Sequence, residues 1–306
     1  MAELEPTSPQ SGRRGRPDER PKLGKPGRRN GWSAAIRYLL PVGPGRSHSA
    51  SDDDLRRSVA WFVPIGLLIG LAWMVVFRVS WRVFGQEAAT LRALPAVAVM
   101  VLECLLTGRY LLGSMPLAVG PRSEFHDPAE PLRGSSPVHF RGLWIITLLI
   151  LSQWILIAGI PDVYLGWFAE SDWRYHFGFW WPKPIFRPLL LAPLWGRWAV
   201  LLAATIGRAA PTADPHTAAL IEAMNPSRLL RHSLLPLLLT IIFLSRTHNR
   251  FIGLILAMIV FAVTFTAAVL MAQWRGGQDR VTVLAAAQTA QLTFLVVYRG
   301  FWPFMQ

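Results

Sequence analysis

Long apolar segments alternate with shorter polar ones along most of the chain. The apolar segments cover approximately residues 59–83, 91–112, 142–163, 189–206, 229–244, 251–273 and 281–301. A transmembrane helix needs about 20 mostly apolar residues to cross the hydrocarbon core of a bilayer. Backbone groups in lipid must be hydrogen-bonded within the protein, and the segments lack the alternation of barrel strands, so we expect helices. The pattern predicts an all-α protein, a polytopic membrane helical bundle.

These segments give a count of about seven spans. The fifth, 229–244, is short and contains Pro236, which removes a helical hydrogen bond, so six spans are the alternative. In the first segment Gly66 and Gly70 lie four residues apart on one face, a spacing that favours close helix packing.

The N-terminal region differs in composition from the rest of the chain. Residues 1–31 are rich in Pro, Gly, Arg and Ser and cannot bury enough apolar surface to fold, which predicts a disordered basic tail. Residues 32–58 are expected to form an interfacial helix and a loop. The transmembrane helical domain then occupies residues 59–306.

Composition and charge restrict the class of protein. Of 306 residues, 52% are hydrophobic and 16% are charged, below the roughly 25% usual for soluble domains. The formal net charge is +13, and a basic cluster precedes the first apolar segment: Arg13, Arg14, Arg16, Arg20, Lys22, Lys25, Arg28 and Arg29. This cluster predicts a multi-pass protein of the cell inner membrane with a cytoplasmic N-terminus, whose tail contacts anionic headgroups. Nucleic acid is not an expected partner, because this region holds one aromatic residue, Trp32, and no recognisable module.

Five blocks of sequence fall in an order that resembles one family of membrane enzymes. They are YLLPV with SASDDDLRRSVAWFVPIGLLIGL at 38–71, LLTG at 105–108, HDPAE at 126–130, LAPLWGRWAVLLAATIGRAAP at 191–211 and QWRGGQDRVTVLAAAQTAQ at 273–291. In this order the chain resembles cobalamin synthase, the adenosylcobinamide-GDP ribazoletransferase, from about residue 38 to the C-terminus.

The resemblance implies an activity, a cofactor and a substrate. The family transfers the adenosylcobinamide phosphoryl group from its GDP ester to α-ribazole in the last steps of cobalamin biosynthesis, which implies a nucleotide-linked corrinoid as binding partner. Such transfers depend on positioning and on charge neutralisation by a divalent metal, here Mg²⁺. The substrate-binding residues that the resemblance implies are Thr107, Gly108, Arg197, Gly276, Gly277 and Asp279.

The chain departs from the family pattern at the metal motif. Gly113, Leu117 and Val119 stand where the family has aspartates, and the segment 135–142 lacks the Asp and Arg of a second motif. Asp127 and Glu130 remain as candidate metal ligands, although an Asp-Pro pair is also typical of an ordinary turn. The single cysteine, Cys104, excludes an internal disulfide and a thiolate metal site.

Two other acidic residues allow a functional and a structural interpretation. Asp279 is either part of a substrate site or the N-cap of the last helix. Glu103 lies within an apolar segment, where a carboxylate is costly and often marks a site. It could equally be held by Arg109, further along the same segment.

Three functions are compatible with these patterns. The first is a transferase of the cobalamin synthase type, whose catalytic competence the missing aspartates put in question. The second is a non-catalytic scaffold or partner of other membrane proteins, and the third is a small-molecule transporter in which Glu103 is the central polar residue. The catalytic residues stay unassigned at this point.

Overall fold

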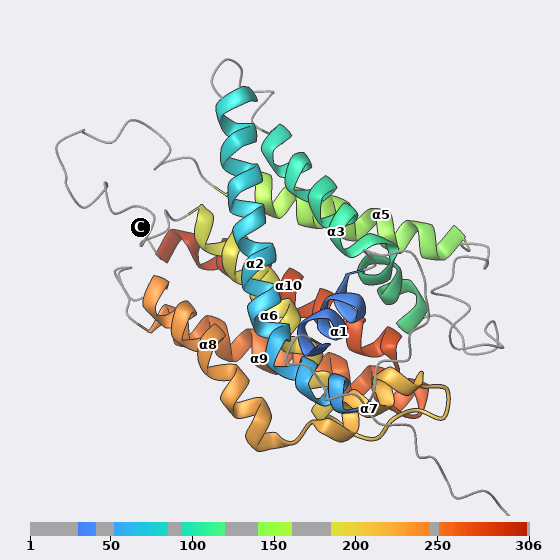
Figure 1. Cartoon of the computed structure of the whole chain (residues 1–306). Helices are drawn as coiled ribbons and strands as arrows, with labels where there is room; N and C mark the ends of the chain where they lie inside the picture. The colour runs from blue at the N-terminus through green and yellow to red at the C-terminus, as the bar shows by residue number, and fades with distance from the viewer. Residues whose placement is uncertain are drawn as a thin grey trace, which may run out of the picture.

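The computed structural model describes residues 30–40, 52–84, 93–119, 140–160, 185–244 and 251–304, and these residues are almost entirely helical (Figure 1). The helices are α1 (Asn30–Leu39), α2 (Asp52–Phe84), α3 (Leu94–Val119), α5 (Phe140–Ala158), α6 (Phe186–Thr205), α7 (Pro215–Ala223), α8 (Pro226–Leu244), α9 (Ile252–Arg275) and α10 (Arg280–Phe301), followed by the 3₁₀ turn Trp302–Phe304. Within the described ranges the one strand-like contact is an isolated bridge between Ala209 and Gln278. The all-α prediction is confirmed.

Five helices are long and apolar enough to cross a membrane: α2 from Arg56 onward, α6, α8, α9 and α10. Helix α3 consists of two apolar parts that meet at 78°, and together they would make a sixth span. The apolar part of α5, Gly142–Ala158, is shorter than the others. The structure thus supports a polytopic helical bundle, while the count of about seven spans stays a prediction.

Helix α6 forms the centre of the bundle. All of its residues from Phe186 to Ala204 are buried, and its main neighbours are α2 and α10. Figure 1 shows α2 crossing in front of α6. A methyl group on Gly66 of α2 would lie 3.0 Å from the Cα of Leu194, and one on Gly70 would lie 2.9 Å from the Cα of Leu190. The two glycines therefore allow the close approach of α2 and α6, as their spacing predicts.

The outer helices present apolar side chains to their surroundings. On α8, Leu230, Leu234 and Leu238 recur every four residues and are 68%, 61% and 56% exposed. On α2, Val75 and Val79 are also largely exposed. Exposed apolar faces on helices of this length are expected where the solvent is lipid. The arrangement agrees with a membrane protein.

Several sequence predictions concern parts of the chain outside the described residues. These include most of the basic tail and the loop that carries Asp127 and Glu130. The predicted interfacial helix lies within the described part, where α1 packs against α2.

Candidate functional site

A cluster of polar side chains lies inside the bundle, where α3, α5, α6 and α10 meet. It consists of Glu103, Gln153, Arg197, Gln288 and Gln291, and none of these residues is more than 1% exposed. We refer to these five residues as the polar core. Polar groups at this depth in a membrane bundle are costly unless they are paired, so their partners decide what the cluster can do.

Both carboxylate oxygens of Glu103 accept hydrogen bonds from glutamine amides. Gln291 donates its Nε2 to Oε1 of Glu103 at 2.6 Å, and Gln153 donates its Nε2 to Oε2. The Oε1 of Gln153 accepts in turn from Nε2 of Gln288 at 3.3 Å. Glu103 is therefore held by α5 and α10 at once, and its carboxylate faces amides instead of an open space.

Arg197 reaches the same cluster from α6. Its Nη1 donates to Oε1 of Gln291 at 3.4 Å, while its Nε and Nη2 are buried without a hydrogen-bond partner among the described residues. The amide of Gln291 thus lies between the carboxylate of Glu103 and the guanidinium. Two opposite charges are brought together inside the protein without a direct ion pair, since a neutral amide bridges them.

The Gly-Arg pair on α6 has a structural explanation. A methyl group on Gly196 would lie 3.2 Å from Oε1 of Gln291 and 3.2 Å from the backbone oxygen of Ala287. The absence of a side chain at this position lets α10 approach α6 closely enough for Gln291 to reach Arg197. Gly196 and Arg197 therefore both serve the contact between α6 and α10: Gly196 leaves space for α10, and Arg197 donates to Gln291.

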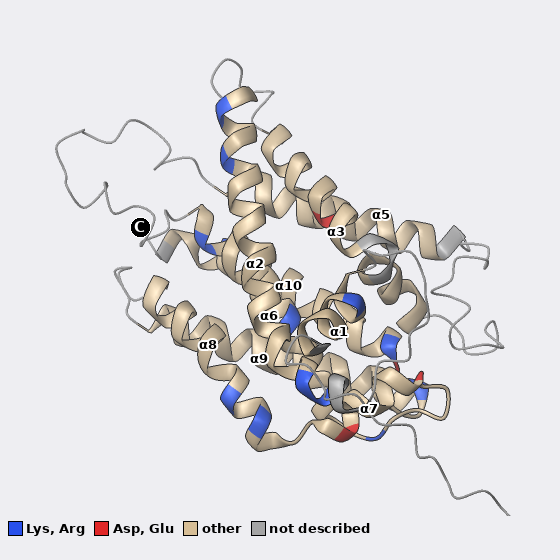
Figure 2. Cartoon of the chain, in the orientation of Figure 1, with Lys and Arg blue, Asp and Glu red and all other residues tan. Residues whose placement is uncertain are grey.

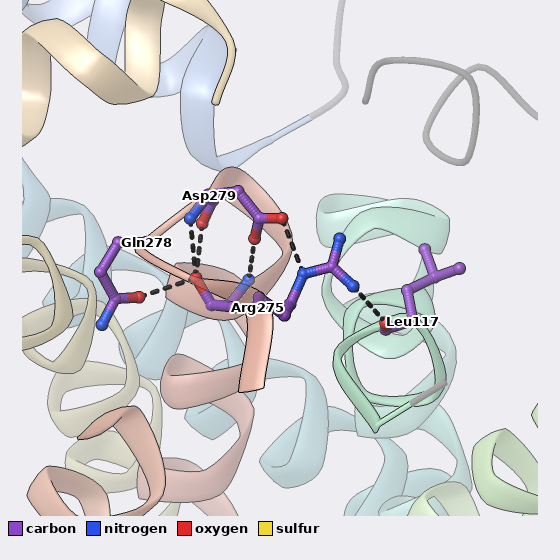
Figure 3. Close-up of polar contacts among 5 residues, drawn as sticks. Leu117, Arg275, Gln278 and Asp279 are labelled. Carbon is purple, nitrogen blue, oxygen red and sulfur yellow. Dashed lines mark hydrogen bonds and ion pairs between the residues drawn. The ribbon is translucent and has the colours of Figure 1, made fainter. Parts of the chain in front are cut away.

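A second polar constellation lies at the turn between α9 and α10 (Figure 3). Gly276 ends α9 with a left-handed φ of 72°, and Gly277 follows with a φ of 142°. A side chain on Gly277 would also collide with Ala210, whose backbone nitrogen would lie 2.7 Å from the added carbon. Both positions favour glycine because L-residues with side chains avoid this backbone region.

Asp279 begins α10 and has two structural tasks. Its Oδ1 accepts from the backbone nitrogen of Thr282 at 2.8 Å, while the hydroxyl of Thr282 accepts from the backbone nitrogen of Asp279 at 2.9 Å. This reciprocal pattern is a capping box, which satisfies free amides at the start of a helix. The Oδ2 of Asp279 forms an ion pair with Nε of Arg275 at 2.8 Å. The N-cap interpretation of Asp279 is confirmed.

Arg275 also links this turn to α3. Its Nη1 donates to the backbone oxygen of Leu117 at 2.9 Å, as the dashed line in Figure 3 shows. Leu117 is one of the positions at which the resemblance implies an aspartate. A guanidinium therefore lies between Asp279 and the segment of α3 that contains Leu117.

The turn is anchored to the loop after α6 through Gln278. Its backbone nitrogen donates to the oxygen of Arg208 at 2.9 Å, and its backbone oxygen accepts from the nitrogen of Ala210 at 2.8 Å. Its side-chain Oε1 accepts from the hydroxyl of Thr282 at 2.7 Å. Figure 3 shows this side chain directed away from Arg275. The turn is thus held from both sides.

Arg280 connects the same turn to α1. Its Nη2 donates to the backbone oxygen of Tyr38 at 2.9 Å, and its guanidinium carbon lies 5.0 Å from the centre of the Tyr38 ring. The hydroxyl of Tyr38 is hydrogen-bonded to that of Thr217 at 3.0 Å. Burial raises the pKa of Tyr38 above its ordinary value, and the negative charge of Asp214 adds to this effect, while Arg280 opposes it.

The sequence-predicted residues fall into these two groups. Arg197 joins Glu103 in the polar core, while Gly276, Gly277 and Asp279 form the α9–α10 turn. Thr107 is buried and its hydroxyl donates to the backbone oxygen of Glu103 at 2.8 Å, a bond within α3. Gly108 and Arg109 belong to α3, but the surroundings of these two residues are outside the described part of the structure. Asp127 and Glu130 also lie outside the described residues.

Sequence reasoning missed the role of three glutamines. Gln153 is a lone amide within an apolar segment, and that isolation is the signal that could have identified it. Gln288 and Gln291 lie in the last apolar segment, and the structure shows that both face the polar core from α10. Their common face follows from a spacing of three residues on a helix.

The described residues do not fit the divalent metal that the resemblance implies. Among them, no group of three or more His, Cys, Asp or Glu side chains is close enough to hold a metal ion. Gly113 and Leu117 offer no side-chain oxygen, and the cationic Arg275 already binds the nearby Asp279. A hard cation such as Mg²⁺ needs oxygen ligands, usually including carboxylates, and this part of the protein presents a positive charge instead.

Comparison with known proteins gives no relative from which a function could be carried over: no family model, no curated protein and no solved structure matches the chain.

Proposed function

We propose that the protein is a cobalamin synthase-like membrane protein that has lost the metal-dependent transfer and serves as a non-catalytic scaffold or partner of other membrane components. The observation that carries this proposal is the position of Arg275. Its guanidinium binds both the carboxylate of Asp279 and the backbone oxygen of Leu117, at 2.8 and 2.9 Å. A metal at Asp279 would have to displace this arginine and would then lie next to its charge.

The polar core supports the same proposal. Glu103 is fully buried, and both of its carboxylate oxygens are bound by amides from two other helices. A transported molecule or a metal would have to replace these amides. The arrangement favours a role for Glu103 in fixing how α3, α5 and α10 pack, which is more useful to a scaffold than to a transporter.

The placement in the membrane is part of the proposal. One end of the bundle carries many of the described arginines: Arg37, Arg56, Arg57, Arg208, Arg228, Arg231, Arg275 and Arg280. The opposite end carries Arg78, Arg82, Arg187 and Arg299. Figure 2 shows the first group around the start of α8 and the region of α7. Lys and Arg are enriched in the cytoplasmic loops of membrane proteins, so we place this end of the bundle and the N-terminus in the cytoplasm. The membrane is a cell inner membrane, which the chain crosses about seven times.

Complementation tests the proposal. A bacterial strain that lacks cobalamin synthase is given the gene for this chain and is grown on medium where growth requires cobalamin. We expect no growth, although the tagged protein is present in the membrane fraction and an active cobalamin synthase rescues the same strain.

A matched variant makes the opposite outcome informative. If the chain restores growth and Asp279→Asn abolishes that growth at an equal protein level, then Asp279 takes part in a transfer reaction and the non-catalytic proposal is wrong. Rescue that survives Asp279→Asn would also contradict the proposal, and it would place the chemistry at other residues.

A further inference from the structure

A basic cleft opens between the starts of α2 and α8, away from the polar core and from the α9–α10 turn. It has a volume of about 530 Å³ and is lined by Arg56, Arg57, Val59, Ala60, Arg228, Arg231 and His232. The four arginines are exposed, and none of the described residues that line the cleft has a carboxylate. Figure 2 shows basic residues in the part of α8 near its start. We call this feature the basic cleft.

The arginines of the basic cleft differ from Arg275 and Arg280 of the α9–α10 turn in the number of donors that they leave available. Arg275 and Arg280 are occupied by Asp279 and by Tyr38, respectively. Within the described residues, Arg56 and Arg231 form no ion pair. Arg228 donates one nitrogen, Nη1, to the backbone oxygen of Ala223 at 2.5 Å, which fixes the guanidinium and leaves its other donors free.

Local contacts on both walls of the cleft hold the helices that carry these arginines. Asn225 accepts from the backbone nitrogen of Arg228 at 2.8 Å at the start of α8, which fixes the first turn of that helix. On the other wall α1 packs closely against the base of Arg57, because a methyl group on Gly31 would lie 3.1 Å from the Cβ of Arg57. Like charges repel, so four guanidinium groups around one cleft repel one another when the cleft is empty. An anion bound between them would relieve this repulsion.

From this geometry we propose that the basic cleft binds a phosphate group. Guanidinium groups match the oxygens of a phosphate with paired N–H donors, and several of them around one concavity are typical of phosphate recognition. The cleft lies where two membrane-crossing helices begin, at the level of lipid headgroups. The phosphate could therefore belong to an anionic lipid or to a soluble phosphate compound. This inference does not depend on the proposed scaffold role.

Two binding measurements on the purified full-length chain in detergent distinguish the two sources. One titrates inorganic pyrophosphate, and the other titrates mixed micelles of phosphatidylglycerol against micelles of phosphatidylcholine, with a stabilising shift of the thermal unfolding midpoint as the readout. The test variant is Arg56→Gln/Arg231→Gln. The matched control is Arg78→Gln/Arg82→Gln, which removes two exposed arginines from the opposite end of α2.

We expect saturable binding of at least one probe, and we expect the cleft variant to weaken it. An arginine near an anionic surface is worth about fivefold in affinity, so the loss of two should weaken binding by about 30-fold. The control variant should bind within about twofold of the wild type, because Arg78 and Arg82 lie about 30 Å along α2 from the cleft, well beyond the screening length of about 8 Å. Binding of phosphatidylglycerol alone identifies a lipid headgroup, and binding of pyrophosphate assigns a soluble phosphate.

The inference is overturned if neither probe binds to the wild type, or if the cleft variant and the control variant bind equally well. Either variant must first show a thermal unfolding midpoint, without probe, close to that of the wild type. If the cleft variant fails this condition, the single variant Arg231→Gln is used in its place, since this side chain is exposed and forms no hydrogen bond or ion pair with the described residues.

Discussion

Glu103 and Arg197 lie on either side of the Gln291 amide, which donates to the carboxylate at 2.6 Å and accepts from the guanidinium at 3.4 Å. The two residues come from α3 and α6, and the amide comes from α10. One neutral side chain thus satisfies two buried groups of opposite charge and fixes the relative position of three helices. A change at Gln291 should affect both partners at once.

Replacing Gln291 with Leu should destabilise the protein by about 2–4 kcal/mol, because a buried carboxylate oxygen and a guanidinium each lose a partner. Thermal or denaturant unfolding in detergent measures this loss. Gln273→Leu is the control, since Gln273 is exposed at the end of α9 and the same substitution should change stability little. Equal effects of the two substitutions would contradict the assigned role of Gln291.

Gly196→Ala should destabilise by about 1–3 kcal/mol, because the added methyl group would press against the Ala287 oxygen and the Gln291 amide at 3.2 Å. Gly300→Ala serves as the comparison, since a methyl group there meets no atom within 4 Å. That change should be neutral or stabilising by about 0.5–1 kcal/mol through helix propensity. A neutral Gly196→Ala variant would show that α6 and α10 do not need this close contact.

Asp279→Ala and Asp279→Asn separate the two tasks of the carboxylate. Asn keeps an oxygen that can accept from the Thr282 nitrogen but loses the charge that binds Arg275, so it should cost about 1 kcal/mol. Ala loses the cap as well and should cost about 2 kcal/mol. Unfolding midpoints measured side by side give this order. If Asn proves as harmful as Ala, the ion pair would matter more than the cap.

Tyr38 predicts a specific response to alkaline pH. Because its pKa in the folded protein is raised above the unfolded value of about 10, its contribution to stability is complete below pH 10 and is lost as the pH rises further. Tyr38→Phe removes this term, so the fall in unfolding midpoint between pH 8 and pH 11 should be smaller in the variant. At pH 8 the variant should lose about 1 kcal/mol, since the hydrogen bond to Thr217 is gone. An unchanged alkaline response would show that Tyr38 is not the group concerned.

The helices could be predicted from the sequence because an apolar segment of membrane-crossing length carries its own signal. The start of α2 at Asp52, ahead of the apolar residues, also has a signal in the sequence, because acidic side chains favour the first turn of a helix. Asp279 could be identified as a possible cap, since Asp is a favoured N-cap residue and stands just before the last apolar segment.

The polar core could not be predicted in the same way. Glu103 stands out in its apolar segment, but its partner Gln153 is 50 residues away and Gln291 is 188 residues away. A nearby arginine in the same segment, Arg109, was the more obvious candidate from local spacing. Only the packing of α3 against α5 and α10 decides between such partners, and this packing depends on many contacts that no local pattern contains.

The contact of Arg275 with Leu117 could not be inferred either, because the acceptor is a backbone oxygen. Every residue type has this backbone oxygen, so the identity of residue 117 gives no indication of the contact. The sequence indicates that Gly113 and Leu117 have no carboxylate where the resemblance implies one. The structure adds that Arg275 contacts the backbone at Leu117.

We propose that the chain does not carry out the transfer that its resemblance implies. A direct assay of the purified protein tests this proposal. The full-length protein in liposomes is incubated with adenosylcobinamide-GDP, α-ribazole and Mg²⁺, and the adenosylcobalamin formed is measured by chromatography. We predict no product above that from empty liposomes. Product that depends on Mg²⁺ and disappears in the Asp279→Asn variant would contradict the account.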